Sequence, residues 1–354
     1  MTFFFDARFI RVTHHDGISR FAANLCTELS KLRDVTAIIS DLGQLRVLPD
    51  GIKYVLECAP TSIHEIGLAR RLNKLGATLV YSPMQTTGSL GRKFRLVLTL
   101  HDLIYYRHRK PPREFNALVR ALWRLYHWSY LPGRLMLSAA DGLVTISKTS
   151  RSLIQRHKLF SGPIEIVYNA PEDAALGYQP RSRPLSKRLI YMGSFMPYKD
   201  VDTLVAGMQE LPDYTLELLS KVHPEEKQRL QKLAGSAAGR LIFRGGVSDE
   251  EYLASLLSAT ALVTASRDEG FGIPLVEAMR VGTPVVCSDL EIFREVAGGA
   301  AIYFETGQPQ SFATQVKALE LDWEGRSKLA IKKAAEYSWR DSAKVLDNFL
   351  KKFD

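Results

Sequence analysis

Two carboxylates, Glu269 and Glu277, bracket a short glycine-containing loop within Ala261–Cys287, which reads ALVTASRDEGFGIPLVEAMRVGTPVVC. Gly270 and Gly272 allow the loop backbone to approach a ligand closely. Carboxylates are poor partners for a phosphate, but they accept hydrogen bonds from sugar hydroxyls. We therefore expect a ligand with a diphosphate in its middle, a hexose held by Glu269 at one end and a ribose held by Glu277 at the other.

The same segment predicts the elements that would position these side chains. It reads as a strand, a loop, a helix, a tight turn and a second strand. Pro274 suits the first helical position, where its missing N–H is not needed, and Gly282 suits the helix end, where a left-handed residue is common. The loop thus runs into a helix N-terminus, whose free N–H groups and partial positive charge favour an anion.

Short apolar runs alternate with helical periodicity along the whole chain. The first series of strand-like runs is Phe3–Asp6, Val35–Ile39, Thr78–Tyr81, Leu96–Leu100, Leu143–Ile146 and Ile164–Tyr168. The second series is Leu189–Met192, Thr215–Leu219, Leu241–Phe243, Ala261–Thr264, Pro284–Cys287 and Ala301–Phe304. This alternation predicts an α/β chain with two Rossmann-like, doubly wound domains facing a central cleft. In such sheets, ligands bind beyond the carboxyl ends of the strands.

Composition divides the chain at a proline-containing polar stretch. We expect a first domain over 1–172, a linker over 173–187, a second domain over 188–336 and a terminal helix over 337–354. One face of this last helix carries five apolar residues: Trp339, Ala343, Leu346, Leu350 and Phe353. Such a stripe must pack on something, and the first domain is the expected surface.

The overall composition is that of a globular protein, with 46% apolar and 24% charged residues among 354. No apolar run approaches the roughly 20 residues of a membrane helix, and the charged N-terminal stretch predicts a buried strand rather than a signal peptide. Cys26, Cys58 and Cys287 are far apart, so they indicate neither a disulfide framework nor a zinc site. A cytoplasmic protein is expected.

The net charge of +9 is concentrated in residues 92–134, which hold ten Lys and Arg against two acidic residues, for a local charge of 10 − 2 = +8. Within it, 113–134 predicts a helix with a basic stripe and an apolar face that includes Leu118, Leu122 and Leu125. Basic residues with nearby tryptophans suit an anionic membrane surface, on the inner face of the membrane for a cytoplasmic protein. The candidate patch is Arg113, Arg120, Trp123, Arg124 and Trp128. The alternative is an ordinary two-faced helix of the first domain.

The run EGFGIPLVEAM followed by GTPVV closely resembles the core signature of glycosyltransferase family 4. The resemblance extends over nearly the whole chain, and it implies a GT-B fold and a retaining, nucleotide-sugar-dependent, mannosyltransferase-like enzyme. It also implies that the donor is bound by Glu269, by Glu277 and by the backbone between them. That backbone belongs to Gly270, Phe271, Gly272 and Ile273.

Other segments resemble the family's remaining donor-site elements. YMGSFMPYKDVDTLVAGM at 191–208 implies Gly193 and Lys199 near the diphosphate, although Ser194 and Tyr198 stand where many members have an arginine. FRGGVSDEEYLASLLSAT at 243–260 implies that Val247 borders the base, and its Ser248 with Glu251 also forms a capping-box spacing.

Two matches fall in the first domain. HHDGISRFAANL at 14–25 implies a glycine loop in which only Gly17 of the usual glycine pair is kept, with Asp16 at the other position. TLHDLIYY at 99–106 implies that His101 lies beside the transferred sugar. The resemblance thus assigns catalysis to His101, Glu269 and Lys199, and it implies no metal ion or other cofactor.

The expected reaction moves a hexose to a glycan or lipid-linked acceptor through an α-glycosidic bond. GDP-mannose is the preferred donor, and a UDP- or TDP-hexose is the alternative. A nucleotide-sugar epimerase or inverting transferase on the same architecture stays open, as does a binding protein without turnover. A basic nucleic-acid-binding protein is the non-enzyme alternative, which the absence of a recognisable nucleic-acid module disfavours.

Overall fold

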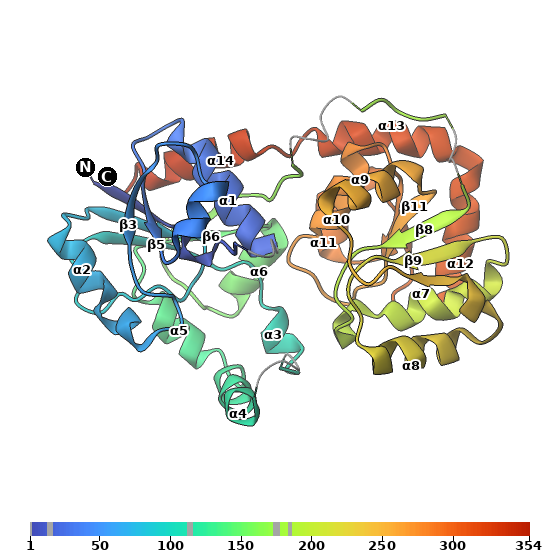
Figure 1. Ribbon diagram of the computed structural model, residues 1–354, viewed down its shortest axis with the longest axis horizontal. Helices are drawn as coiled ribbons and strands as arrows, with labels where there is room; N and C mark the ends of the chain where they lie inside the picture. The colour runs from blue at the N-terminus through green and yellow to red at the C-terminus, as the bar shows by residue number, and fades with distance from the viewer. Residues whose placement is uncertain (1, 13–16, 112–115, 173–177, 183–185) are drawn as a thin grey trace. The chain divides into compact units, whose positions relative to one another are not determined.

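The computed structural model describes the chain except for residues 1, 13–16, 112–115, 173–177 and 183–185. The chain divides into two compact units (Figure 1). The first comprises Met1–Asn169 with Ser338–Asp354, and the second comprises Ala170–Tyr337. The described part of the segment expected to be a linker belongs to the second unit. Arg181 fixes it there, because its guanidinium donates to Thr283 Oγ1 at 2.8 Å and lies 5.0 Å from the ring of Trp323.

The described residues of the first unit form a seven-stranded parallel sheet in the order β3-β2-β1-β4-β5-β6-β7. The strands are β1 (Phe3–Asp6), β2 (Thr36–Ile39), β3 (Lys53–Leu56), β4 (Leu79–Ser82), β5 (Arg95–Thr99), β6 (Gly142–Thr145) and β7 (Ile164–Ile166). Phe4 of β1 pairs with Thr36 on one side and Val80 on the other, so the strand order reverses between β1 and β4. Most of these strands read as apolar runs because parallel sheets are covered on both faces.

Helices cover this sheet, and the last helix of the chain is among them. The helices of this unit are α1 (Gly17–Ser30), α2 (Leu68–Lys74), α3 (Ile104–Arg107), α4 (Ala117–Tyr126), α5 (Leu131–Leu137), α6 (Lys148–Arg156) and α14 (Trp339–Leu350). α14 lies along α1 (Figure 1), where the rings of Trp339 and Phe21 meet edge to face at 5.8 Å. Ser342 Oγ donates to the Tyr168 carbonyl at 2.7 Å. The apolar face of α14 thus completes the core of the first unit.

The described residues of the second unit form a six-stranded parallel sheet in the order β10-β9-β8-β11-β12-β13. The strands are β8 (Arg188–Tyr191), β9 (Thr215–Leu218), β10 (Leu241–Phe243), β11 (Ala261–Thr264), β12 (Val285–Ser288) and β13 (Ile302–Phe304). The helices are α7 (Val201–Gly207), α8 (Pro224–Ala234), α9 (Asp249–Ser258), α10 (Ile273–Arg280), α11 (Glu291–Ala297), α12 (Pro309–Leu319) and α13 (Trp323–Ala334). The prediction of an α/β chain with two doubly wound units is confirmed.

Candidate donor site

The second sheet has a topological switch point between β8 and β11, where ligands bind in open α/β sheets. After β8 the chain passes Gly193, whose N–H donates to Ser220 Oγ at 3.1 Å, and enters the short helix η5 (Pro197–Lys199). After β11 it enters the loop that contains Glu269. The residues predicted from these two segments therefore meet at the same edge of the sheet.

An ion pair joins the two segments. Lys199 Nζ lies 2.5 Å from Glu269 Oε1, and both side chains are mostly buried. Ser266 Oγ donates to the same carboxylate oxygen at 2.9 Å. The backbone N–H of Arg267 donates to the Tyr198 carbonyl at 2.7 Å, which holds the two loops together. A cation and a carboxylate are thus fixed side by side at the carboxyl ends of β8 and β11, with the surrounding protein reducing their exposure to water.

The buried phenol of Tyr191 lies near the Lys199–Glu269 pair. Burial raises the pKa of Tyr191 well above its usual value, and the negative charge of Glu269 adds to the shift. Tyr191 therefore stays neutral, and its hydroxyl donates to the Ser194 carbonyl at 2.6 Å. This bond ties the turn after β8 to the strand.

The loop before α10 is shaped by one glycine and one buried aromatic ring. Gly272 has a φ of 92°, a left-handed conformation that side chains disfavour, and it is the residue from which α10 begins. The Phe271 ring is buried and meets Tyr337 edge to face at 5.5 Å. Since the Phe271 side chain points into the core, the loop offers its backbone to a ligand. The predicted helix end is also confirmed, because Gly282 has a φ of 72° and follows the last turn of α10.

Replacing Gly272 by alanine should destabilise the second unit and disturb this loop. A Cβ at this position would lie 2.9 Å from Phe293 Cε1 and would adopt a positive φ. We expect a loss of about 1–3 kcal/mol in the free energy of unfolding, measured by chemical denaturation. Gly299→Ala is the matched control, because a Cβ there meets no atom within 4 Å. Equal stability of the two variants would contradict the strained loop.

Glu277 lies on α10 and contacts α9. Tyr252 OH donates to Glu277 Oε2 at 3.0 Å. The N-terminus of α9 carries the predicted capping box, in which Glu251 N–H donates to Ser248 Oγ at 3.2 Å and Ser248 N–H donates to Glu251 Oε2 at 2.8 Å. Val247 directly precedes this cap and is partly exposed. The cap fixes the start of α9, and Tyr252 orients the Glu277 carboxylate.

His101 and Gly17 belong to the first unit. His101 follows β5, its Nε2 lies 2.8 Å from the Pro83 carbonyl oxygen, and its ring meets Phe21 edge to face at 5.0 Å. These two contacts fix the orientation of the imidazole. Gly17 is the first residue of α1, while Asp16 lies outside the described residues.

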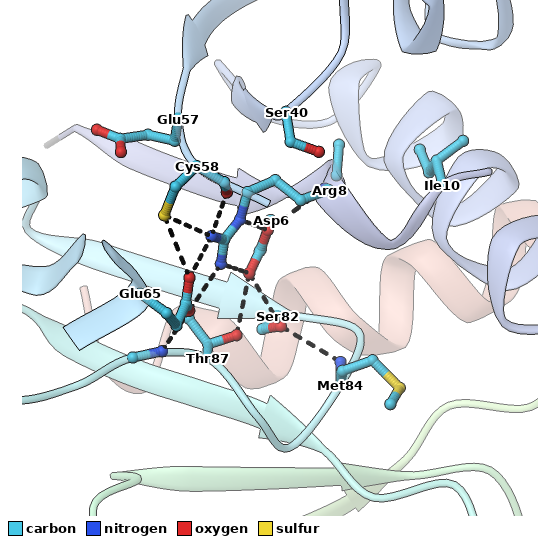
Figure 2. Close-up of polar contacts among 12 residues, drawn as sticks. Asp6, Arg8, Ile10, Ser40, Glu57, Cys58, Glu65, Ser82, Met84 and Thr87 are labelled. Atoms are coloured by element: carbon cyan, nitrogen blue, oxygen red, sulfur yellow. Dashed lines mark hydrogen bonds and ion pairs between the residues drawn. The ribbon is translucent and has the colours of Figure 1, made fainter. Parts of the chain in front are cut away.

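A buried polar cluster, which the sequence did not predict, lies at the switch point of the first sheet (Figure 2). The Arg8 guanidinium donates to both carboxylate oxygens of Asp6, at 2.8 and 2.9 Å, and to Glu65 Oε2 at 2.6 Å. Burial alone would lower the pKa of Arg8, but the two carboxylates outweigh it and raise that pKa. Thr87 Oγ1 donates to Asp6 Oδ2 at 3.0 Å, and Gly88 N–H donates to Glu65 Oε1 at 2.7 Å.

This cluster ties together the segments that follow β1, β3 and β4. Its link to His101 runs through Ser82, whose Oγ lies 3.4 Å from Asp6 Oδ2 and which precedes Pro83, the residue that contacts His101. A charged pair at the end of the first buried strand was the available signal, since Asp6 and Arg8 interrupt an otherwise apolar stretch. Their partner Glu65 is far away in sequence and carried no such signal.

The residues of the basic patch differ in their surroundings. Arg124 and Trp128 are exposed, whereas the Trp123 ring packs 5.2 Å from Tyr105 on the inner side of α4. Arg120 is partly buried. Arg113 lies outside the described residues. Among those described, no helix is long and apolar enough to cross a bilayer.

Comparison with known proteins identifies this architecture. Residues 179–336 match the family described as Glycosyl transferases group 1. O-antigen chain mannosyltransferase B of Escherichia coli is 28% identical over 268 residues, which cover 70% of this chain and 68% of that protein. O-antigen chain mannosyltransferase RfbU of Salmonella typhimurium is 23% identical over 314 residues, covering 86% and 87%. HepE of Anabaena, solved with UDP and glucose, aligns over 99% of this chain and 100% of its own with a TM-score of 0.72 and 17% identity.

The two doubly wound units have the GT-B fold of glycosyltransferases. The second unit, which holds Lys199, Glu269 and Glu277, is a glycosyl transferases group 1 domain, and the protein is a hexosyltransferase. The prediction of a glycosyltransferase is confirmed.

Proposed function

We propose that this chain transfers mannose from GDP-mannose to a glycan or lipid-linked acceptor, with retention of the anomeric configuration. The observation that carries the proposal is the Lys199–Glu269 pair at the switch point of the second sheet, beside the glycine loop that opens α10. The mannosyltransferase names of the E. coli and Salmonella relatives support the choice of sugar. The complex of HepE with UDP and glucose supports a nucleotide and a sugar as ligands of this fold.

In this proposal, Lys199 and the loop amides receive the diphosphate. The bond between the anomeric carbon and the phosphate oxygen breaks, and negative charge grows on the departing diphosphate. Lys199 and the N–H groups of Gly270 to Ile273 stabilise that charge without reorganising, which is the usual source of large rate effects. An acceptor hydroxyl forms the new bond to the anomeric carbon, and its proton passes to an oxygen of the departing diphosphate. No step requires a metal ion.

The ion pair gives both partners a defined starting position. When the donor binds, Lys199 exchanges its carboxylate partner for phosphate oxygens, and Glu269 exchanges its ammonium partner for hexose hydroxyls. Glu277 accepts hydrogen bonds from the ribose, Val247 borders the base and Gly193 leaves room for the diphosphate. Gly17 and His101 are assigned to the donor phosphates and to the transferred sugar by resemblance to the family.

A thermal-shift panel tests the donor. A ligand that binds only the folded state stabilises it by about 2.7 kcal/mol at a concentration of 100 times its Kd. We expect GDP-mannose and GDP to raise the melting temperature by several degrees, and UDP-glucose and TDP-glucose to leave it unchanged. A shift with UDP-glucose alone would instead favour a UDP-hexose donor; UDP is the nucleotide in the HepE complex. The anomeric configuration of the product, read by NMR, then tests retention.

A further inference from the structure

Helix α4 presents its leucines to the solvent. Leu118, Leu122 and Leu125 recur at intervals of four and three residues, which places them on one face of the helix. They are 70%, 57% and 70% exposed. We call these three residues the leucine ridge. Amphipathic helices of globular proteins turn such a face toward the core, so this orientation requires an explanation.

Aromatic contacts beside the leucine ridge hold the helix in this orientation. Trp123 packs against Tyr105 of α3 at 5.2 Å, and Tyr126 lies 6.4 Å from Tyr106. After the helix, Tyr130 stacks on Tyr106 at 4.6 Å. Aromatic rings therefore connect α4 to α3. These specific contacts, and not the absence of a packing partner for α4, leave the leucine ridge facing the solvent.

The exposed apolar surface continues beyond α4. Trp128 is 73% exposed, and Leu131 and Leu135, one turn apart on α5, are also exposed. The described part of 104–138 contains six basic residues and no acidic residue. The basic residues are Arg107, Arg109, Lys110, Arg120, Arg124 and Arg134. The surface thus combines exposed apolar side chains with an unbalanced positive charge.

We propose that the leucine ridge and Trp128 insert into the interface of an anionic lipid bilayer, with the neighbouring Arg and Lys side chains on the headgroups. Apolar side chains on one face, tryptophan at its border and surrounding cations are the features that interfacial helices share. Charge decides between this occupant and a second copy of the chain. A symmetric interface would set the same cations against one another, whereas anionic headgroups neutralise them.

Flotation with vesicles tests this docking surface. The full chain is mixed with vesicles of phosphatidylcholine alone or of equal parts phosphatidylcholine and phosphatidylglycerol. We expect it to float with the anionic vesicles at low salt and to be released at molar salt, because salt screens the headgroup charge. Absence of flotation with anionic vesicles at low salt would overturn the proposal.

Two matched pairs of variants assign the binding to these residues. Replacing Leu118, Leu122 and Leu125 by serine should lower the vesicle partition coefficient at least about tenfold, since each buried leucine contributes substantially. The control replaces two exposed leucines elsewhere, Leu42 and Leu321, by serine. Control binding should equal that of the unchanged chain, and melting curves should show that both variants are folded.

The second pair tests charge. Replacing Arg109, Lys110 and Arg124 by glutamine should also reduce binding to anionic vesicles about tenfold or more, whereas the control Lys232→Gln with Lys317→Gln should not. Analytical ultracentrifugation of the same proteins tests the other occupant. A dimer that dissociates when the leucine ridge is replaced, or a leucine-ridge variant that floats like the unchanged chain, would overturn membrane docking.

Discussion

Replacing Lys199 by alanine is expected to lower kcat by about 10²- to 10³-fold, the range seen when a preorganised donor to a developing negative charge is removed. The ammonium group lies at the carboxyl end of β8, held 2.5 Å from Glu269. The ammonium group is therefore already positioned to bind a diphosphate at the switch point. Initial rates with GDP-mannose as donor, over a range of donor concentrations, measure the effect.

A second lysine–glutamate pair in the same unit provides the control. Lys187 pairs with Glu320 and lies 4.9 Å from the ring of Tyr214, but it precedes β8 and so lies at the amino ends of the strands. Lys187→Ala removes a comparable charge from the amino ends of the strands, away from the proposed donor site. The kcat of this variant should stay near that of the unchanged enzyme. Lys199→Arg should recover part of the activity, because it restores the charge with a different geometry. Equal activity of Lys199→Ala and Lys187→Ala would remove Lys199 from the proposed mechanism.

The strands could be predicted from local sequence because most of them are covered on both faces. Ala261–Thr264 is fully buried and reads as an unbroken apolar run. The exception is β3, which was missed. It begins with Lys53, includes the exposed Tyr54 and forms the edge of its sheet, so it buries too little to show an apolar pattern. The order of the strands depends on pairings between distant segments, which a local pattern does not contain.

In the candidate site, too, the local features could be predicted from the sequence and the contacts between distant segments could not. The loop and caps around α10 follow from residue types, as Gly272 and Gly282 show. The contact between Lys199 and Glu269 joins residues on two separate strand ends, so only the resemblance to a family placed them in one site. The Arg8–Glu65 pair had neither a local pattern nor a motif, and it was missed. For α4, periodicity indicated two faces, but the aromatic residues of neighbouring helices decide which face is turned inward.

Glu277→Ala is expected to weaken donor binding, raising the Kd of GDP-mannose about 10- to 100-fold, because a charged hydrogen-bond acceptor contributes about 1.5–3 kcal/mol. If Glu277 contacts the ribose, GDP alone should lose affinity by the same factor. Glu269→Gln, which changes the hexose side, should lower turnover without weakening GDP binding, because it leaves Lys199 free for the diphosphate. Calorimetric titration with GDP and GDP-mannose separates the two ends of the donor. Glu291→Ala is the control, an exposed glutamate at the start of α11.

The hydroxyl of Tyr252 tests whether the orientation of Glu277 matters as well as its charge. Tyr252→Phe removes the 3.0 Å hydrogen bond and keeps the ring that packs in α9. We expect it to lose less GDP affinity than Glu277→Ala, and to add nothing further when both changes are combined. Such non-additivity would mean that Tyr252 acts through Glu277. Additive losses would mean that the tyrosine contributes to binding independently, and unchanged GDP affinity in Glu277→Ala would place the ribose elsewhere.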